Sequence, residues 1–281
     1  MLRMRKLFSF IKTGLSFLRQ GQIIEFFRFL RHTLYAVTHF STQGNIIMEE
    51  PTQALDTKGL KIAVYTCIVG HYDQLLEPQY VEPGIDYYVF TDIDCPASSV
   101  WKKIDITQFE EYKALTPTQL NRKIKMLPFM YLPDYDYSLY VDGNIMIIDA
   151  ISPMIQEMGH HAFGVHYHRT RDCIYDELVR VEYSRKADIT IAKRQIATYK
   201  EQGYPRHHGL YENTMLIRKH NDQATCQLME AWWQEYAKYP TRDQLSLPYL
   251  IWKLGYDKKK IHILGMNLYH NPRFKKINSH S

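Results

Sequence analysis

The residues of this chain best suited to chemistry are Asp142-Gly143-Asn144, which follow an apolar run from Tyr137 to Val141. A second apolar run, Ile145 to Ile148, comes directly after them. This pattern is typical of a buried strand whose end releases a carboxylate and an amide oxygen together. Oxygen ligands suit a hard cation such as Mg²⁺ or Mn²⁺, which could neutralise a diphosphate. The segment therefore predicts a metal and nucleotide-sugar site at Asp142 and Asn144.

Short Asp-x-Asp/Asn motifs also arise by chance, so the context has to choose among them. The chain holds two more, Asp92-Ile93-Asp94 and Asp134-Tyr135-Asp136. Only Asp142 lies inside an uninterrupted apolar segment. We therefore expect the metal at Asp142 and not at the other two motifs.

Charge is distributed unevenly along the 281 residues. The net charge is +5, yet residues 1–40 hold seven basic side chains against Glu25 alone, which leaves the remainder slightly acidic. A nucleic-acid-binding domain would carry its basic face on the folded core, so this class is excluded. The four cysteines form no Cys-x-x-Cys pair, which predicts reduced thiols of a cytoplasmic protein and no zinc site.

The first 40 residues mix basic and apolar positions, and Lys12 and Arg19 interrupt the apolar runs. The runs are too short for a transmembrane helix, and no signal-peptide cleavage site follows them. We expect a basic amphipathic helical segment at 1–40, followed by a polar linker at 41–60. Two interpretations stay open: contact with an anionic membrane surface, at the inner face of the membrane, or packing on the body or on a second subunit.

From residue 61 onward, strand-like and helix-like segments alternate, which predicts an α/β sheet. In such sheets ligands bind beyond the carboxyl ends of the strands. Three polar groups fall at such ends: Gly70–Asp73, Asp92 and Asp142. The expected elements are strands at 61–69, 87–90, 101–106 and 137–141, and a helix at 116–127.

The second half is richest in ionisable residues between His160 and Glu177, and we expect some of them to line a cleft. The segment 182–203 resembles one long polar helix. Another helix opens near Asp243, whose plainer role is a charge at a helix start. His270 comes shortly after an apolar strand at 261–264.

Taken together, these motifs resemble GT-A glycosyltransferases. More narrowly, they resemble the glycosyltransferase-like domain-of-unknown-function family shared by plant wall-polysaccharide proteins and bacterial polysaccharide-cluster proteins. The resemblance covers residues 61–273 and implies a GT-A (Rossmann-like) mixed sheet flanked by helices in a domain at 61–281. The matching signatures are Phe90-Thr91-Asp92, Arg122-x-x-Lys125, Tyr140 to Asn144, His168 to Glu177, Glu212-Asn213 and Arg242 to Ser246.

A looser similarity to the glycogenin-like transferases of family 8 implies a role for each site residue. His270 would join Asp142 and Asn144 on Mn²⁺ or Mg²⁺, although an asparagine in place of the family's second aspartate implies weaker metal binding. The resemblance also implies donor binding by Tyr72, Asp73, Asp92, Arg122 and Lys125. It implies catalytic roles for Asp243, Gln244 and Glu212. His168, Arg171 and Glu177 would line a donor or acceptor cleft.

The expected function is metal-dependent transfer of a sugar from a nucleoside diphosphate sugar to a glycan or lipid-linked glycan acceptor in surface polysaccharide synthesis. The expected donor is a UDP-sugar. The alternative is a non-catalytic glycan- or membrane-binding module on the same fold. A nucleotidyltransferase is disfavoured, because no Gly-rich phosphate loop follows the first strand. Whether the protein forms a homo-oligomer stays open.

Overall fold

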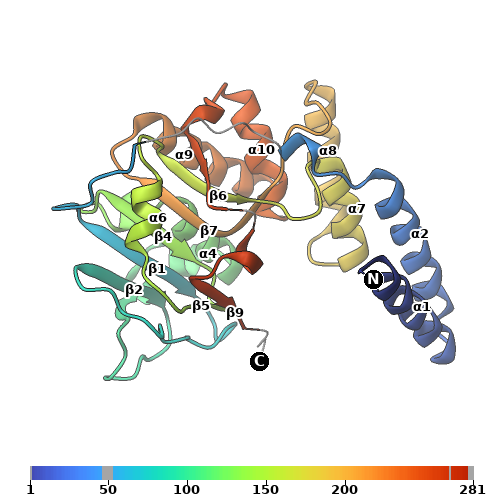
Figure 1. Ribbon diagram of the computed structural model, residues 1–281, viewed down its shortest axis with the longest axis horizontal. Helices are drawn as coiled ribbons and strands as arrows, with labels where there is room; N and C mark the ends of the chain where they lie inside the picture. Colours follow the sequence, from blue (N-terminus) through green and yellow to red (C-terminus); the bar gives the residue numbers. More distant parts are fainter. Residues whose placement is uncertain (1, 46–52, 266, 278–281) are drawn as a thin grey trace.

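The computed structural model describes residues 2–45, 53–265 and 267–277, and it is built around a seven-stranded sheet (Figure 1). The strand order is β3-β2-β1-β4-β7-β6-β8. The strands are β1 (Ile62–Ile68), β2 (Ile85–Thr91), β3 (Lys102–Asp105), β4 (Tyr137–Val141), β6 (Phe163–Tyr167), β7 (Tyr211–Lys219) and β8 (Ile261–Ile263). Two short strands, β5 (Ile145–Ile147) and β9 (Phe274–Lys276), form a separate antiparallel pair.

The main sheet is mixed, as the sequence predicted. β3, β2, β1 and β4 run parallel, whereas β7 is antiparallel to both β4 and β6, and β8 is parallel to β6. The carboxyl ends of β1, β2 and β4 therefore lie at one edge. The expected α/β fold class, a mixed sheet flanked by helices, is confirmed.

Both faces of the sheet are covered, which is why β1 is buried along its whole length and is mostly apolar. Alternate residues point to opposite faces, so Tyr65 and Cys67 join one core while Ile62 and Val64 join the other. The first core includes residues of α4 (Pro117–Met126), α7 (Ile174–Ser184), α8 (Ile189–Glu201), α9 (Gln223–Lys238) and α10 (Asp243–Lys253). The second includes residues of α6 (Ser152–Glu157).

The expected single helix at 182–203 is wrong, because α7 and α8 are separate. Arg185 ends α7 in the left-handed conformation with φ 53°. Asp188 then opens α8, and its carboxylate accepts hydrogen bonds from the backbone of Thr190 and Ile191. An aspartate with this capping geometry starts a new helix rather than continuing the old one. The remaining short helices are α3 (Glu111–Ala114), α5 (Pro128–Tyr131), η1 (Gln43–Asn45), η2 (Ile106–Gln108), η3 (Lys258–Lys260) and η4 (Leu268–His270).

The N-terminal hairpin consists of α1 (Leu2–Arg19) and α2 (Ile23–His39), and it extends from one side of the body beside α7 (Figure 1). His32 stacks on Tyr183 with ring centroids 4.2 Å apart, and the Tyr35 hydroxyl donates to Asp176 at 2.9 Å. The inner face of α2 is thus packed on α7. In the described part of the chain, no helix combines the length and apolar character needed to cross a membrane.

The predicted linker at 41–60 lies partly outside the described residues, because 46–52 are not among them. Its first part is not free of the body. The side-chain amide of Asn45 donates to the carbonyls of His168 and Arg171 at 3.1 and 2.9 Å, and its oxygen accepts from the backbone of Leu210 at 2.9 Å. The division into 1–40, 41–60 and 61–281 stays a prediction.

Candidate active site

The polar ends of β1 and β4 meet, as expected for neighbouring parallel strands. Gly143 shows how closely: a Cβ atom there would lie 3.0 Å from Asp73 Oδ2 and 3.1 Å from Ile68 Cγ1. Only a glycine fits between the two loops without displacing them. The turn that carries Asp142 and Asn144 is therefore packed directly against the loop after β1.

Asp92, at the end of β2, supports the loop after β1. Its carboxylate accepts the backbone N–H of Gly70 at 2.9 and 3.2 Å and the Tyr112 hydroxyl at 3.1 Å. Tyr72, further along this loop, is 70% exposed and therefore accessible to a ligand. These contacts give Asp92 a role in supporting the loop after β1.

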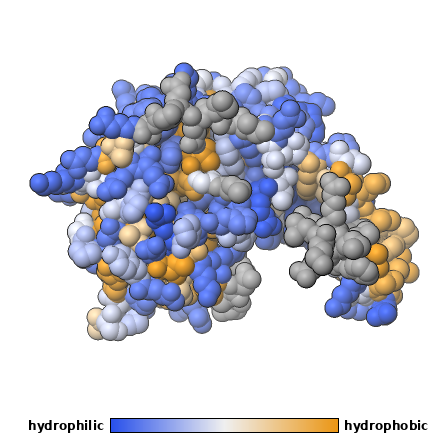
Figure 2. All heavy atoms as spheres, viewed as in Figure 1, coloured by the Kyte–Doolittle hydropathy of each residue, from blue (hydrophilic) through white to orange (hydrophobic). Residues whose placement is uncertain are grey.

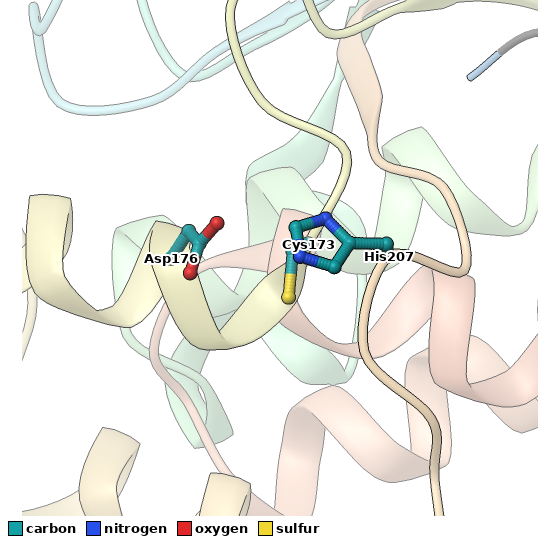
Figure 3. Close-up of side chains that lie close together, drawn as sticks. All are labelled: Cys173, Asp176 and His207. Atoms are coloured by element: carbon teal, nitrogen blue, oxygen red, sulfur yellow. The ribbon is translucent and has the colours of Figure 1, made fainter. Parts of the chain in front are cut away.

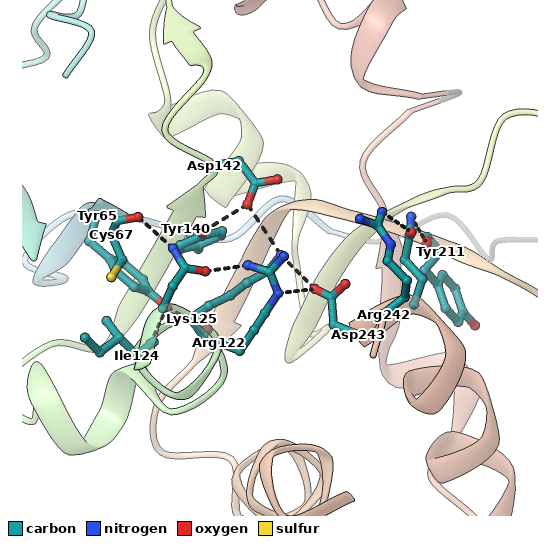
Figure 4. A network of polar contacts seen from close by, with 12 residues as sticks. Tyr65, Cys67, Arg122, Ile124, Lys125, Tyr140, Asp142, Tyr211, Arg242 and Asp243 are labelled. Carbon is teal, nitrogen blue, oxygen red and sulfur yellow. Dashed lines mark hydrogen bonds and ion pairs between the residues drawn. The ribbon is translucent and has the colours of Figure 1, made fainter. Parts of the chain in front are cut away.

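Arg122 and Lys125 lie on α4, whose start is fixed by a capping box between Thr116 and Gln119. Lys125 is only 1% exposed, and its Nζ lies 2.9 Å from Asp243 Oδ2 and 3.5 Å from Asp142 Oδ1 (Figure 4). Arg122 Nε lies 3.5 Å from the same Asp243 oxygen. We call Arg122, Lys125, Asp142 and Asp243 the paired network. The two cations expected on a diphosphate thus contact protein carboxylates.

Electrostatics keep Asp243 ionised inside the paired network. Burial opposes its ionisation, but the charges of Lys125, Arg122 and Arg242 outweigh burial and hold the pKa of Asp243 well below its usual range. The same carboxylates raise the pKa of Arg122 against the effect of its own burial. Asp243 and Arg122 therefore stay charged near neutral pH.

Asp142 is only partly engaged by the protein. Its Oδ1 accepts the Tyr140 hydroxyl at 2.9 Å and faces Lys125, whereas Oδ2 contacts no polar group among the described residues. Burial, followed by the Asp142 charge, raises the pKa of Tyr140 well above its ordinary value, so this phenol stays a donor. One carboxylate oxygen is thus held in place while the other stays available.

The other two predicted metal ligands are accessible as well. Asn144 is half-buried, and its backbone carbonyl accepts the N–H of Ile277 at 2.9 Å. His270 is exposed, and its Nδ1 lies 3.0 Å from Asn267 Oδ1, which leaves Nε2 without a contact to the described residues. A carboxylate oxygen, an amide oxygen and an imidazole nitrogen fit Mn²⁺ or Mg²⁺ in chemical type.

The predicted cleft residues of the second half are brought together. Arg171 donates from Nε to Glu177 at 2.6 Å, and its guanidinium lies 2.8 Å from His168 Nε2. Burial, followed by the charges of Arg171, Arg169 and Arg242, lowers the pKa of His168 to about 2. His168 therefore stays neutral at physiological pH and serves as a packed polar group.

Of the predicted catalytic residues, Glu212 on β7 and Gln244 on α10 line the same cleft as His168. Gln244 accepts from Arg242 at 2.9 Å and donates weakly to the Tyr211 carbonyl at 3.4 Å. Burial raises the pKa of Glu212, which makes this carboxylate more basic than an exposed glutamate. Asp243, at the first position of α10, lies in the paired network instead.

Sequence reasoning missed the residues that hold Lys125 in position. Arg218 is buried and donates to the Lys125 carbonyl and to the Tyr65 hydroxyl, both at 2.6 Å. Tyr65 in turn donates to the Lys125 carbonyl at 2.9 Å. An arginine inside an apolar strand was the available signal, because a buried charge requires partners.

Asn213 is a second omission. It lies between Glu212 and Thr214 on β7, it is buried, and neither polar atom of its amide has a partner among the described residues. Buried amides are normally hydrogen-bonded, so an unsatisfied one indicates an interaction completed by water or a ligand.

Among the described residues, one group of His, Cys, Asp or Glu side chains is close enough to hold a metal, and it is not the predicted one. Cys173, Asp176 and His207 lie together beside the hairpin, with ligand atoms within 4.8 Å of one another (Figure 3). Asp176 already accepts hydrogen bonds from Tyr35 and, at 2.6 Å, from Arg206. Burial raises the pKa of the Cys173 thiol. A neighbouring guanidinium and a protonated thiol both oppose a cation there, so we interpret this group as structural.

The fold is that of an α/β protein with charged side chains gathered at the carboxyl ends of its parallel strands. Residues 91–281 match the family model for the TOD1/MUCI70 glycosyltransferase-like domain, and the chain belongs to this family. The predicted class, glycosyltransferase, is thereby confirmed at the level of the family. No curated protein matches the chain.

Two solved structures are similar in shape. Mouse xyloside xylosyltransferase 1, in its apo form, aligns with 73% of this chain and 85% of its own at 9% identity and a TM-score of 0.42. The mannosyltransferase Ktr4p of S. cerevisiae aligns with 77% of this chain and 72% of its own at 10% identity and a TM-score of 0.40. Family membership rests on the sequence match, since both TM-scores are below 0.5.

Proposed function

We propose that the protein transfers a glycosyl group from a nucleoside diphosphate sugar to a glycan or glycolipid acceptor in surface polysaccharide synthesis. The donor that we propose is a UDP-sugar. The observation that carries the proposal is the single edge on which the loop after β1, the turn at Asp142 and the paired network come together. The family match supports the reaction class.

Asp142, Asn144 and His270 would hold Mn²⁺ or Mg²⁺ on the diphosphate. When bound, the ion would supply positive charge to the leaving group. Tyr72 and Asp73 are suited to the base and the ribose. The paired network would keep the metal-binding carboxylate in a fixed position, which is how preorganised charges contribute to catalysis.

The pKa shifts favour different roles for the two remaining carboxylates. Asp243 is too weak a base to take a proton, because Lys125 and Arg122 stabilise its ionised form. Glu212 has a raised pKa and lines the cleft, so it is the better general base for an acceptor hydroxyl if the reaction inverts the anomeric centre. Asp243 and Gln244 would then orient the donor sugar.

The test is donor hydrolysis by wild-type protein and by Asp142→Ala, with Mn²⁺ or Mg²⁺ added. We expect the variant to lose at least 100-fold in rate, in line with the loss of charge stabilisation at a reacting centre. Asp134→Ala, an exposed residue of a rival motif that precedes β4 whereas Asp142 follows it, is the matched control. Full activity of Asp142→Ala would refute the metal assignment.

The alternative, a non-catalytic binding module, makes a different prediction. Calorimetry with UDP and Mn²⁺ would find no metal-dependent binding, because a degenerate site need not hold a diphosphate. Metal-dependent binding without hydrolysis or transfer against a screen of UDP-, GDP- and CDP-sugars would also favour this alternative.

We further propose that the N-terminal hairpin holds the protein on an anionic membrane surface, on the cytoplasmic side. Figure 2 shows hydrophobic residues along the outer side of the hairpin. Of the fifteen large apolar side chains that are exposed among the described residues, nine lie between Ile11 and Val37. They recur at helical spacing on α2 as Ile23, Phe27, Leu30, Leu34 and Val37.

Charge favours a membrane over a second protein copy as the occupant of this face. Glu25, the acidic residue of the hairpin, pairs with Arg185 of the body at 2.8 Å. Lys12 and Arg19 of α1 have no ion pair among the described residues, which leaves the outer part of the hairpin basic. Basic amphipathic helices of this kind bind anionic lipid surfaces.

Phe27→Asp/Leu34→Asp tests this surface, since these side chains are 62% and 66% exposed and their loss leaves the α7 contacts intact. We expect the variant to lose sedimentation with phosphatidylglycerol vesicles, while Leu254→Asp, an exposed leucine on the body, retains it. The proposal would be contradicted if the wild-type protein did not bind these vesicles, or if light scattering showed that it dimerises through this face.

A further inference from the structure

A cleft of about 230 Å³ lies beside the paired network, between α7, the start of α10 and the segment around η4 and β9. It continues directly from Asp142, because Thr214 lines it and the Thr214 carbonyl accepts the Asp142 backbone N–H at 2.9 Å. A ligand in this cleft would therefore lie next to the proposed reaction centre.

Cations outnumber carboxylates on the walls of this cleft. It is lined by five cationic side chains, Arg171, Arg180, Lys186, Arg242 and Lys276, and by two carboxylates, Glu177 and Glu212. The first carboxylate is occupied by Arg171 at 2.6 Å. The second, Glu212, accepts the backbone N–H of Arg169 at 3.4 Å, so both carboxylates already have partners within the protein.

Four of these cations form no ion pair within the described residues: Arg180, Lys186, Arg242 and Lys276. We call them the cationic cleft. They also act on one another, since the pKa of Lys186 is lowered first by partial burial and then by Arg242, Lys276 and Arg180. Like charges gathered in a concave, partly desolvated site create a positive potential that attracts anions.

The position of the cleft in the sheet separates it from the proposed nucleotide loops. Asp73 and Asp92 follow β1 and β2, on one side of β4 in the strand order. The cleft lies on the other side of β4, along β7. An anion bound there would face the donor across Asp142, where an acceptor has to lie for transfer.

We propose that Arg180, Lys186, Arg242 and Lys276 form an oxyanion subsite for the acceptor, which is a glycan or lipid-linked glycan that carries a phosphate or a carboxylate group. This inference rests on the proposed function for its assignment to the acceptor. The diphosphate of the donor is the other anion that these cations could bind, and the experiment below distinguishes the donor from the acceptor.

The experiment is calorimetry on full-length protein saturated with UDP and Mg²⁺, titrated with inorganic phosphate in one arm and with trigalacturonate in the other. We expect at least one anion to bind without displacing UDP. In Arg180→Ala/Lys186→Ala its affinity should fall at least tenfold, with UDP affinity within twofold of wild type. Neither residue forms an ion pair with a described residue, so the variant is expected to fold.

Arg194→Ala/Lys200→Ala, which removes the same two charges from the exposed surface of α8, is the matched control and should leave anion affinity unchanged. The proposal is overturned if neither anion binds the wild type, if the control variant loses as much affinity, or if UDP affinity falls together with that of the anion. The last outcome would assign the cleft to the donor. If UDP fails to bind at all, the proposed function fails, and the same titrations without UDP still decide whether the cleft is an anion site.

Discussion

The paired network and the cationic cleft lie side by side, but the charges of the network are paired with one another, whereas the cations of the cleft form no ion pair with described residues. In the network, Lys125 and Asp243 are 1% and 3% exposed and contact each other at 2.9 Å. In the cleft, Arg180 is half-buried, Lys186 is exposed, and neither forms an ion pair with described residues. A buried pair is part of the folded structure, whereas unpaired cations at a concave surface are free to bind a ligand. The comparison separates residues that stabilise the structure of the site from residues that are available to bind a ligand.

The largest expected difference is in stability. Lys125→Met should lower the free energy of unfolding by about 3–5 kcal/mol, because it leaves the buried Asp243 carboxylate without its closest partner. Lys186→Met, the matched change in the cleft, should alter it by less than about 0.5 kcal/mol. Urea unfolding followed by circular dichroism measures both. Equal effects of the two substitutions would remove the distinction between the regions.

A pH dependence is expected at His168, which lines the cleft. Its folded pKa of about 2 lies below the ordinary 6.5, so below pH 6.5 the unfolded chain binds a proton that the folded protein refuses. Stability should therefore fall as the pH drops from 6.5 toward 2, by up to about 1.4 kcal/mol per pH unit for this group.

His168→Gln should remove this part of the slope in unfolding measurements between pH 4 and 7. Other buried histidines, among them His166 and His220 with pKa values lowered to about 4, keep their own contributions in the variant. An identical slope in the variant would show that His168 does not titrate differently in the two states.

The smallest expected effect sharpens the role of the turn after β4. Asn144→Asp adds a charged oxygen ligand beside Asp142, and we expect it to raise the affinity for Mn²⁺ in the presence of UDP severalfold. Asn144 is half-buried and its side chain forms no hydrogen bond with described residues, so stability should hardly change. Weaker metal binding in this variant would place the ion away from Asn144.

The edge of the sheet was predictable from sequence because local patterns determine it. Apolar runs identified β1, β2 and β4, and parallel neighbours necessarily end on one side, which brought Asp73, Asp92 and Asp142 together. The cleft at His168, Arg171 and Glu177 was also indicated, by the local density of ionisable residues.

The pairing of charges could not be derived in this way. Lys125 and Asp243 are 118 residues apart, and no local pattern states that a lysine on one helix neutralises an aspartate at the start of another. The same holds for Arg218, whose partners lie on β1 and α4. The break between α7 and α8 was missed because the capping by Asp188 outweighs the continuous polar composition on either side.

Asn45 has a consequence for the order of events during synthesis. Its side chain joins loops that include Leu210, 165 residues further along the chain, and α2 rests on α7. At translation rates of about 5–20 residues per second, these partners are synthesised about 10–30 s after the hairpin and Asn45. The wall of the cleft is therefore completed late, when the segment around Asn45 closes against loops that are made well after it.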